Sequence, residues 1–381
     1  MKPSHASDNW RVRWIAWRNG VVGNPRFQRF AARFALTRPV ARRRATALFD
    51  RVTGFVSSQI LAACIELGAL DQLAEGPVDG EHLAREWQMS VAAADRLLRA
   101  AAAIRLAEKL PDGRWMLGSE GAALRGNRGI AEMIAHHHLL YADLADPVAL
   151  LRRGGGGGAL SRYWHYAESA GQGDADAVAP YSRLMAASQP LVAADVIDSY
   201  RFARHRRLLD VGGGEGAFIG AVAARVPGLD LGLFDLPAVG ARARAALSAQ
   251  GLSDRVAIHA GDFFSGDLPT GYDLITLVRI LHDHDDAPAQ QLLRNIFAAL
   301  ADGGTLLIAE PMAETRGAET SGDAYFGLYL WAMGSGRPRS AATIRTMLET
   351  AGFSSIRETA TPQPMAVRVI VAQRQRRHRQ D

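Results

Sequence analysis

Two patterns of hydrophobic residues divide the chain. Between about residues 45 and 150, apolar residues recur every three or four positions, a spacing that predicts amphipathic helices. From residue 208 onward, short apolar runs alternate with helical segments, which predicts a parallel sheet covered by helices on both faces. The predicted strands are 208–211, 229–234, 256–261, 272–278, 305–310 and 367–372, and the predicted helices are 217–225, 238–250, 288–300 and 341–351. The second half of the chain is therefore predicted to be an α/β domain.

The first half has the pattern of a winged helix. Helical periodicity over 55–73, 81–87 and 92–106 is followed by two short apolar segments on either side of a Pro-Asp-Gly turn at 111–113. Arg96 and Arg99 on the third helix fit DNA recognition. However, the alanines around them give a smooth face with few base-reading side chains. A domain that packs on another protein surface is the favoured interpretation, and no nucleic-acid partner is expected.

Glycine and the helical pattern define the region between these halves. Gly154 to Gly158 form an unbroken glycine run, which predicts a mobile loop or a linker tip. Residues 181–200 return to helical periodicity. The predicted parts are a basic and aromatic N-terminal arm (1–45), a winged-helix-like domain (46–125), a helical linker region (126–200), an α/β domain (201–374) and a basic tail (375–381).

Composition favours a cytoplasmic protein. The chain has 381 residues, 48% of them hydrophobic, and no apolar run reaches the roughly 18 residues that span a bilayer. Its single cysteine, Cys64, permits no internal disulfide. The net charge of +5 is concentrated near the ends, in Arg42–Arg44 and in Arg374–Arg379. Solvated ends are the simpler interpretation; contact of these runs and of Trp10, Trp14 and Trp17 with an anionic membrane surface is the alternative.

A glycine-rich turn follows the first predicted strand of the α/β domain. The run Leu208-Leu-Asp-Val-Gly-Gly-Gly-Glu-Gly-Ala-Phe218 lets a ligand approach the backbone closely at Gly212 and Gly214. The spacing fits a dinucleotide loop as well as a loop for S-adenosylmethionine. Glu215 favours S-adenosylmethionine, because a carboxylate is a poor neighbour for pyrophosphate and suits a cationic ligand.

Three acids come at the ends of successive predicted strands. Asp210 precedes the glycine turn, Asp235 with Leu236 follows the second strand, and Asp262 with Phe263 follows the third. An acid about 20 residues beyond such a loop is well placed to accept both ribose hydroxyls. An acid with a flanking aromatic ring suits an adenine amine and its ring. Together these residues predict a nucleoside site.

This ordered set resembles class I S-adenosylmethionine-dependent methyltransferases. The segment Val278-Arg-Ile-Leu-His-Asp-His-Asp-Asp286 is similar to the Leu-His-Asp-Trp segment of the small-molecule O-methyltransferases that include plant caffeic acid, acetylserotonin and bacterial polyketide enzymes. The resemblance implies a homodimer. It assigns residues 46–125 to a winged-helix-like dimerisation domain, 126–200 to linker and substrate-pocket helices, and 201–374 to a Rossmann-like catalytic domain that binds S-adenosylmethionine. It also implies that His282 is the general base, that Arg279 contacts the cofactor, and that Glu310 orients the base, with Asp283 beside it.

One position departs from the family pattern. The family's Gly-Gly-Lys-Glu-Arg-Thr segment supplies a second carboxylate near the histidine, whereas the matching stretch Ser335 to Ser340 has Pro338 at that place. Proline has no side chain that hydrogen-bonds. We therefore expect Glu310 or Asp283 to suffice.

A narrower resemblance points to the carotenoid branch of the family. Segments 139–147, 181–188 and 322–330 are similar to hydroxyneurosporene or demethylspheroidene O-methyltransferases. This implies an apolar hydroxylated acceptor, contact with the inner or intracytoplasmic membrane, and a substrate pocket that includes Met185, Tyr325, Tyr329 and Met333. An aromatic polyketide acceptor, a winged-helix regulator that senses S-adenosylmethionine without catalysis, and a nicotinamide dehydrogenase are the alternatives.

No metal is expected. His136, His137 and His138 are consecutive on a predicted helix and point in different directions, so they cannot bind one ion together. Pocket lining or polar packing is the favoured role for them. The acids and His284 near the predicted base are assigned by the resemblance to a loop beside it.

Overall fold

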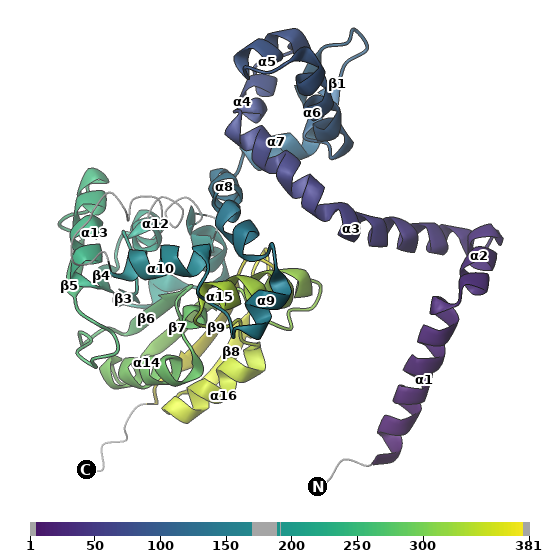
Figure 1. Ribbon diagram of the computed structural model, residues 1–381. Coiled ribbons are helices and arrows are strands. Elements are labelled where there is room, and N and C mark those ends of the chain that lie inside the picture. The colour runs from purple at the N-terminus through teal and green to yellow at the C-terminus, as the bar shows by residue number, and fades with distance from the viewer. Residues whose placement is uncertain (1–4, 170–188, 191, 376–381) are drawn as a thin grey trace, which may run out of the picture. The chain divides into compact units, whose positions relative to one another are not determined.

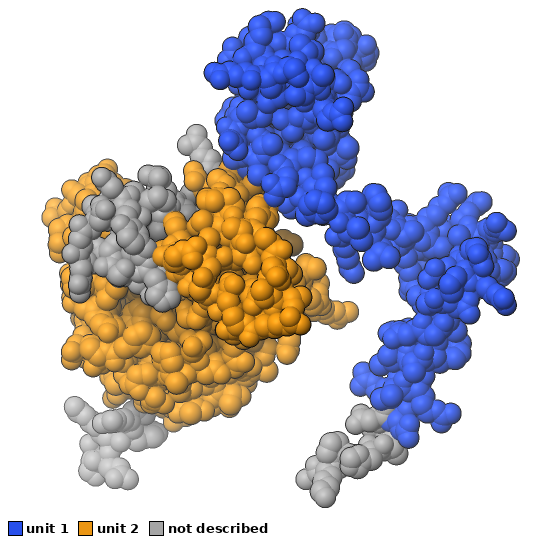
Figure 2. Space-filling model, in the orientation of Figure 1, with its two compact units in different colours: residues 1–122 blue, residues 123–381 orange. Residues whose placement is uncertain are grey.

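The computed structural model describes residues 5–169, 189–190 and 192–375. The chain forms two compact units, Met1–Ala122 and Ala123–Asp381 (Figures 1 and 2). The mixed architecture agrees with the prediction of a mainly helical N-terminal part and a C-terminal α/β domain.

Unit 1 is mainly helical. Its elements are α1 (His5–Gly23), α2 (Pro25–Arg33), α3 (Arg38–Glu66), α4 (Ala69–Ala74), α5 (Gly80–Glu86), α6 (Val91–Ala103), β1 (Ala107–Lys109), β2 (Trp115–Leu117) and the start of α7 (Ser119–Arg125). The helix predicted over 55–73 was wrong in one respect: it is broken at Gly68, whose positive φ of 64° ends α3 and starts α4. Helix α3 also continues without a break through residue 45, where the N-terminal arm was predicted to end.

The predicted helices and two-stranded wing are present. Ser90 caps α6 by accepting a hydrogen bond from the backbone of Ala93 at 3.2 Å. Strands β1 and β2 pair antiparallel, with Ala107 opposite Leu117. Leu83 and Leu98 from two of the helices and Trp115 from the wing are buried. Their burial accounts for the folding of this small domain around one core.

Helix α3 is long and apolar enough, by length and composition, to cross a membrane. Only 6% of its most apolar window is buried. Leu48, Phe49, Val52 and Phe55 on this helix are exposed. An exposed row of large apolar side chains marks a contact surface.

Unit 2 begins with helices α8 (Arg128–Asp143), α9 (Pro147–Arg152) and α10 (Ala159–Ser169). Gly154–Gly158 connect α9 and α10 as a turn that packs against the rest of unit 2. Gly156 donates its backbone N–H to the carbonyl of Trp331 at 2.9 Å, and both Gly156 and Gly158 are buried. A Cβ at Gly158 would lie 2.0 Å from a carboxylate oxygen of Asp143, so close packing is the reason for glycine there.

The α/β part contains a seven-stranded sheet in the order β5-β4-β3-β6-β7-β9-β8. Strands β7 and β9 are antiparallel, as are β9 and β8, and the other pairs are parallel. The strands are β3 (Arg207–Val211), β4 (Asp230–Asp235), β5 (Val256–Ala260), β6 (Leu274–Val278), β7 (Thr305–Glu310), β8 (Ser354–Thr359) and β9 (Arg368–Gln373). The order reverses between β3 and β6, which places a ligand crevice at the carboxyl ends of these strands.

Helices cover both faces of this sheet. Helices α14 (Asp286–Ala299) and α16 (Ala341–Ala351) pack on one face, and α12 (Ala217–Arg225) and α13 (Pro237–Ala249) pack on the other (Figure 1). Successive strand residues point to opposite faces of the sheet. Leu208 therefore packs in the apolar core under α12 and α13, and Leu209 packs in the core under α14 and α16. The near-continuous apolar runs of the sequence reflect this burial on two sides.

Among the elements that were not predicted, the π-helix η4 (Thr320–Phe326), α15 (Gly327–Met333) and β8 shape the α/β part. Helices η4 and α15 cover the carboxyl edge of the sheet, and β8 forms its outer strand. Tyr329, Leu330 and Met333 of α15 join Leu140 of α8 and Leu160 of α10 in a third apolar core. This core places the side chains of α8, α10 and α15 beside one another at the crevice.

Candidate active site

A cavity of about 250 Å³ lies at the carboxyl ends of β3, β4 and β6, where the strand order reverses. One group of lining residues comes from the sheet edge and includes the glycine turn. The other comes from α8, α10, η4 and α15. The site therefore joins a predicted nucleoside-binding edge to an apolar and aromatic wall: Met133, His136, Trp164, Tyr325, Phe326, Tyr329, Leu330 and Met333.

The glycine turn and Asp235 form one hydrogen-bonded unit. Gly214 has a φ of 57° and donates its N–H to Oδ2 of Asp235 at 2.8 Å. Leu236 donates to Oδ1 of the same carboxylate at 2.7 Å. Burial raises the pKa of Asp235, and the two backbone donors oppose that rise. The space beside the Cα of Gly214 is open, so a ligand has access to the backbone.

Asp210 lies in β3, two residues before Gly212 at the start of the glycine turn. It is buried, and Thr276 donates its hydroxyl to the Asp210 carboxylate at 2.7 Å. Burial raises the pKa of Asp210 to about 7, against the lowering effect of the Thr276 bond. Asp210 does not line the cavity, unlike Gly212 and Gly214. Its contact with β6 accounts for its position at the end of β3.

The third predicted acid does not line the cavity. Asp262 is exposed and accepts a hydrogen bond from the backbone of Phe264 at 2.8 Å. Phe263 lines the cavity, with its ring 5.5 Å from that of His284. Arg279 also lines the cavity and has a positive φ of 60°, a conformation that is strained for a residue with a side chain.

Three buried polar atoms lack a hydrogen-bond partner within the described part of the chain, and all three belong to lining residues. They are Oε1 of Gln189, Nε of Arg242 and Nδ1 of His282. Arg242 Nε is nevertheless 3.3 Å from a carboxylate oxygen of Glu215, close enough for charge attraction. Buried polar groups without partners are uncommon in folded proteins. Their convergence on one cavity fits a ligand that carries both charged and hydrogen-bonding groups.

His282 lies between two carboxylates. Its Nε2 is 3.1 Å from Oδ1 of Asp283, and its Nδ1 is 3.6 Å from Oε1 of Glu310. The backbone N–H of His282 donates to the same Glu310 oxygen at 3.1 Å. Burial alone would lower the pKa of His282, but the two carboxylates, Asp283 above all, raise it to about 10. Burial also opposes the low pKa of Asp283, which the charge of His282 maintains.

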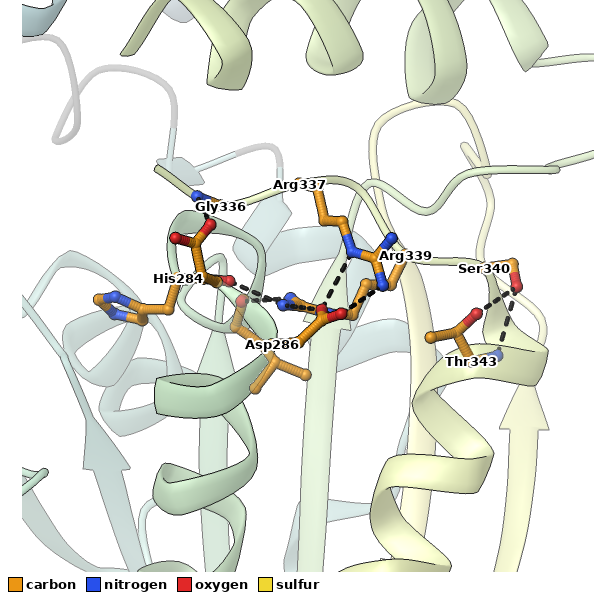
Figure 3. A network of polar contacts seen from close by, with 9 residues as sticks. His284, Asp286, Gly336, Arg337, Arg339, Ser340 and Thr343 are labelled. Carbon is orange, nitrogen blue, oxygen red and sulfur yellow. Dashed lines mark hydrogen bonds and ion pairs between the residues drawn. The ribbon is translucent and has the colours of Figure 1, made fainter. Parts of the chain in front are cut away.

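The loop that carries His282 is held by residues 335–339 (Figure 3). Arg339 is 2% exposed and donates to the carbonyls of Leu281 at 2.8 Å and His284 at 2.7 Å. It also donates to Asp286 at 2.8 Å, and Arg337 donates to the same carboxylate at 3.0 Å. Backbone bonds complete this clamp: Arg337 donates its N–H to the carbonyl of His282 at 2.9 Å.

Pro338 lies within this clamp. As expected from the sequence, it offers no carboxylate to the imidazole. Asp283 and Glu310 are the carboxylates whose contacts with His282 the structure describes. Residues 335–339 therefore act on His282 by fixing the loop that carries it.

A network of neutral polar side chains lines the other wall. His136 Nε2 is 2.9 Å from the hydroxyl of Tyr329, and His137 Nε2 is 2.8 Å from the hydroxyl of Tyr325. Trp164 donates to the Tyr329 hydroxyl at 3.3 Å. Burial lowers the pKa of His136 to about 4 and raises the pKa of both tyrosines, so these groups are uncharged near neutral pH. Met185 lies outside the described residues.

Sequence reasoning did not single out several lining residues. Arg242 lies in the middle of α13 and Gln189 in a helical turn, and neither belongs to a motif. Tyr325, Tyr329 and Met333 were predicted from the resemblance, and all three line the cavity. The three consecutive histidines diverge as expected: His138 contacts the carbonyl of Ala135, away from the partners of His136 and His137. Within the described ranges, no cluster of three metal-ligating side chains is present.

Similarity to known proteins agrees with this geometry. The sequence matches the O-methyltransferase domain family over residues 141–354 and the O-methyltransferase dimerisation domain family over residues 49–118. Demethylspheroidene O-methyltransferase of Cereibacter sphaeroides is 41% identical over 355 residues, which cover 93% of each chain. The enzyme of the same name from Rhodobacter capsulatus is 40% identical over 93% of this chain and 88% of its own.

Solved structures show the same fold. The structure described as PigF with SAH superposes with a TM-score of 0.71 and 26% identity, over 86% of this chain and 99% of its own. These matches set aside a nicotinamide dehydrogenase and a non-catalytic regulator as the identity of the chain. The chain belongs to the O-methyltransferase family and carries that family's dimerisation domain.

Proposed function

We infer that this protein is a homodimeric enzyme that transfers the methyl group of S-adenosylmethionine to a hydroxyl group of a hydroxycarotenoid. The observation that carries the inference is one cavity lined by the glycine turn, by His282 and by an apolar aromatic wall. The acceptor class is supported by identities of 41% and 40% to demethylspheroidene enzymes over nearly the whole chain.

The sheet edge fits the methyl donor. Asp235 keeps lone pairs beyond those used by Gly214 and Leu236, and a carboxylate at this position suits the two ribose hydroxyls. Glu215 offers a negative charge to a cationic amino-acid end, and the ring of Phe263 suits an adenine. When bound, S-adenosylmethionine supplies a sulfonium methyl group for in-line displacement.

His282 accounts for the proton. Formation of the ether bond makes the acceptor hydroxyl acidic, and a neutral imidazole within hydrogen-bond reach can take its proton during transfer. Asp283 stabilises the imidazolium that results, and Glu310 accepts a hydrogen bond from the backbone N–H of His282. Because an aliphatic alcohol is a much weaker acid than a phenol, whose pKa is about 10, proton removal must accompany transfer. Positioning therefore carries a large share of the rate.

The acceptor wall fits an uncharged molecule. Met133, Leu330 and Met333 provide apolar surface, and the neutral His136–Tyr329 pair provides hydrogen-bonding groups without a net charge. A carboxylate or ammonium acceptor would lose hydration there without gaining a counter-ion. A long hydrocarbon with one hydroxyl group loses little hydration free energy when it enters this part of the cavity.

The test is methyl transfer from labelled S-adenosylmethionine to a panel of detergent-solubilised hydroxycarotenoids and of naphthols. We expect transfer to the hydroxycarotenoids. The His282→Ala variant should bind S-adenosylmethionine as the wild type does and lose turnover by about 100-fold or more, as expected for a general base. Transfer to naphthols alone would overturn the acceptor class, and unchanged turnover of the variant would remove His282 from the mechanism.

A further inference from the structure

The first 48 residues differ in charge from the rest of the chain. They contain eleven Lys and Arg residues and one acid, Asp8, whereas the remainder contains more acidic than basic residues. The basic residues continue from α1 through α2 to Arg42–Arg44 at the start of α3. We refer to residues 5–44 as the arm. Its charge attracts an anionic partner.

The arm also exposes a row of indole rings. Trp10, Trp14 and Trp17 are spaced four and three residues apart on α1, so they lie on one side of the helix. They are 62%, 52% and 59% exposed. The rings of Trp14 and Trp17 stack at 4.9 Å, which leaves a flat aromatic surface uncovered within unit 1.

Helix α2 repeats this arrangement. Phe27 and Phe30, with Phe34 directly after the helix, lie on one face, and Arg26, Arg29 and Arg33 lie on the adjacent face, about 100° around the helix axis. All three phenylalanines are exposed. Asn24 caps the helix by accepting from the backbone of Arg26 at 2.8 Å. The helix is thus amphipathic in the manner of helices that lie in a bilayer interface.

The dimerisation family match does not include these aromatic rings. The dimerisation family match begins at residue 49, after both helices. A second arm would bring a like charge onto the first, which opposes self-association. The phosphates of a nucleic acid would pair with the arginines. A duplex, however, offers no apolar surface for the six large exposed aromatic side chains of α1 and α2. An anionic lipid bilayer offers a partner to both kinds of side chain: its headgroups can contact the arginines, and its acyl chains can contact the Trp and Phe rings.

We propose that the arm docks this protein on the surface of an anionic lipid bilayer. Trp10, Trp14, Trp17, Phe27, Phe30 and Phe34 enter the interface, and the flanking arginines contact phosphate headgroups. The proposal rests on the proposed function in one respect, because an acceptor that dissolves in the bilayer gives the docking its purpose. The 93% match to the Cereibacter sphaeroides enzyme extends into the residues that precede the dimerisation domain, so part of the arm is aligned with that relative.

The experiment is flotation of the full-length protein with vesicles in the absence of any acceptor. Vesicles of phosphatidylglycerol and phosphatidylcholine at a ratio of about 3:7 should carry most of the protein at low salt, since basic residues supply much of the binding. Vesicles of pure phosphatidylcholine should carry at least about tenfold less, and raising the salt should release the protein from the anionic vesicles.

Two variants separate the aromatic and the basic contributions. Trp10→Ala/Trp14→Ala/Trp17→Ala should weaken binding about tenfold or more, with loss of the blue shift of tryptophan fluorescence on vesicles. Arg26→Gln/Arg29→Gln/Arg33→Gln should weaken it similarly and flatten the salt dependence. The matched controls are Val148→Ala/Leu151→Ala, which removes exposed apolar side chains of α9, and Arg85→Gln/Arg96→Gln/Arg201→Gln, which removes the same charge elsewhere. Both controls should float as the wild type does.

Three results would overturn the proposal. One is wild-type protein that does not float with anionic vesicles. Another is duplex DNA binding by the arm without vesicle binding. The third is loss of the dimer in the tryptophan variant without lipid, which would make a second copy the partner. Methyl transfer in detergent is a separate measurement: arm variants should retain it, and its absence from the wild type would reject the acceptor and leave the docking result unaffected.

Discussion

The position of His282 between two carboxylates fixes how activity depends on pH. Because Asp283 and Glu310 raise the pKa of His282 to about 10, the ligand-free protein holds an imidazolium at neutral pH. The base is the neutral form. We expect kcat/KM to rise about tenfold per pH unit up to a plateau near that pKa, since kcat/KM reports the free enzyme.

Asp283→Asn tests the cause of this profile. Burial by itself lowers the pKa of His282, so removal of the nearest negative charge should move the rise in kcat/KM to lower pH by about one to three units. Asp285→Asn removes a charge from the same loop and keeps an acceptor for Gly336. It should leave the profile in place. An unchanged profile in Asp283→Asn would assign the rise to a group other than His282.

Asp235 provides a second prediction at the scale of single residues. Both of its oxygens accept backbone hydrogen bonds, so Asp235→Asn places an amide against the N–H of Gly214 or Leu236. We expect the dissociation constant for S-adenosylmethionine to rise about 10- to 100-fold, the cost of losing a hydrogen bond to a charged group. Calorimetric titration measures it. Asp230→Asn, at the opposite end of β4, should bind normally.

At the scale of elements, the clamp of residues 335–339 orients the catalytic loop. Arg339→Met keeps the volume of the buried side chain but leaves the carbonyls of Leu281 and His284 without their donor. We expect a loss of about 2 to 4 kcal/mol in the free energy of unfolding, from two buried acceptors without partners. We also expect a lower kcat with little change in the affinity for S-adenosylmethionine, because the glycine turn is on another element.

Arg337→Gln is the matched control for this prediction. Arg337 contacts the same carboxylate, Asp286, but its side chain is more than half exposed. Exposed ion pairs contribute between about 0 and 1 kcal/mol. The control should therefore unfold within about 1 kcal/mol of the wild type. Equal losses in the two variants would show that the ion pair, and not the bonds to the loop, supplies the stability.

The sequence predicted the elements whose burial follows a regular pattern. Strand 305–310 is buried throughout, and helices 217–225 and 341–351 are buried along one face and end at clear turn residues, so all three were placed without error. Strand β8 was missed because its side chains alternate between half-buried and exposed at the sheet edge. The close packing at the glycine run 154–158 was not predicted. A run of glycines in the sequence indicates a free backbone, but it does not reveal that Asp143 leaves no space for a Cβ at Gly158.

Prediction of the site was limited in the same way. Acids and glycines at strand ends belong to motifs with fixed spacing, so Asp235 and Gly214 were found. Arg242 and Gln189 enter the cavity from helices through tertiary packing, which leaves no local pattern. Arg339 contacts residues that lie 53 to 58 positions earlier in the chain. A pattern within a single sequence does not indicate a contact between segments that far apart.

At the scale of the whole molecule, we expect the exposed apolar side of α3 to provide the surface for assembly. Phe49, Val52 and Phe55 are exposed in unit 1 and lie at or within the start of the dimerisation family match. A surface of this kind is stable in water when a second copy covers it. Light scattering should give a mass twice the 41.1 kDa of one chain for the wild type.

Phe49→Glu/Phe55→Glu should convert this dimer to a monomer, because a dimer would bury four carboxylates in an apolar interface without counter-ions. Val148→Glu/Leu151→Glu adds the same charge to exposed positions of α9, outside the dimerisation match, and should remain dimeric. Circular dichroism of both variants separates dissociation from unfolding. If the α3 variant stays dimeric and folded, the contact lies on another face, and the row of apolar residues on α3 then becomes part of the membrane-docking surface that begins with α1 and α2.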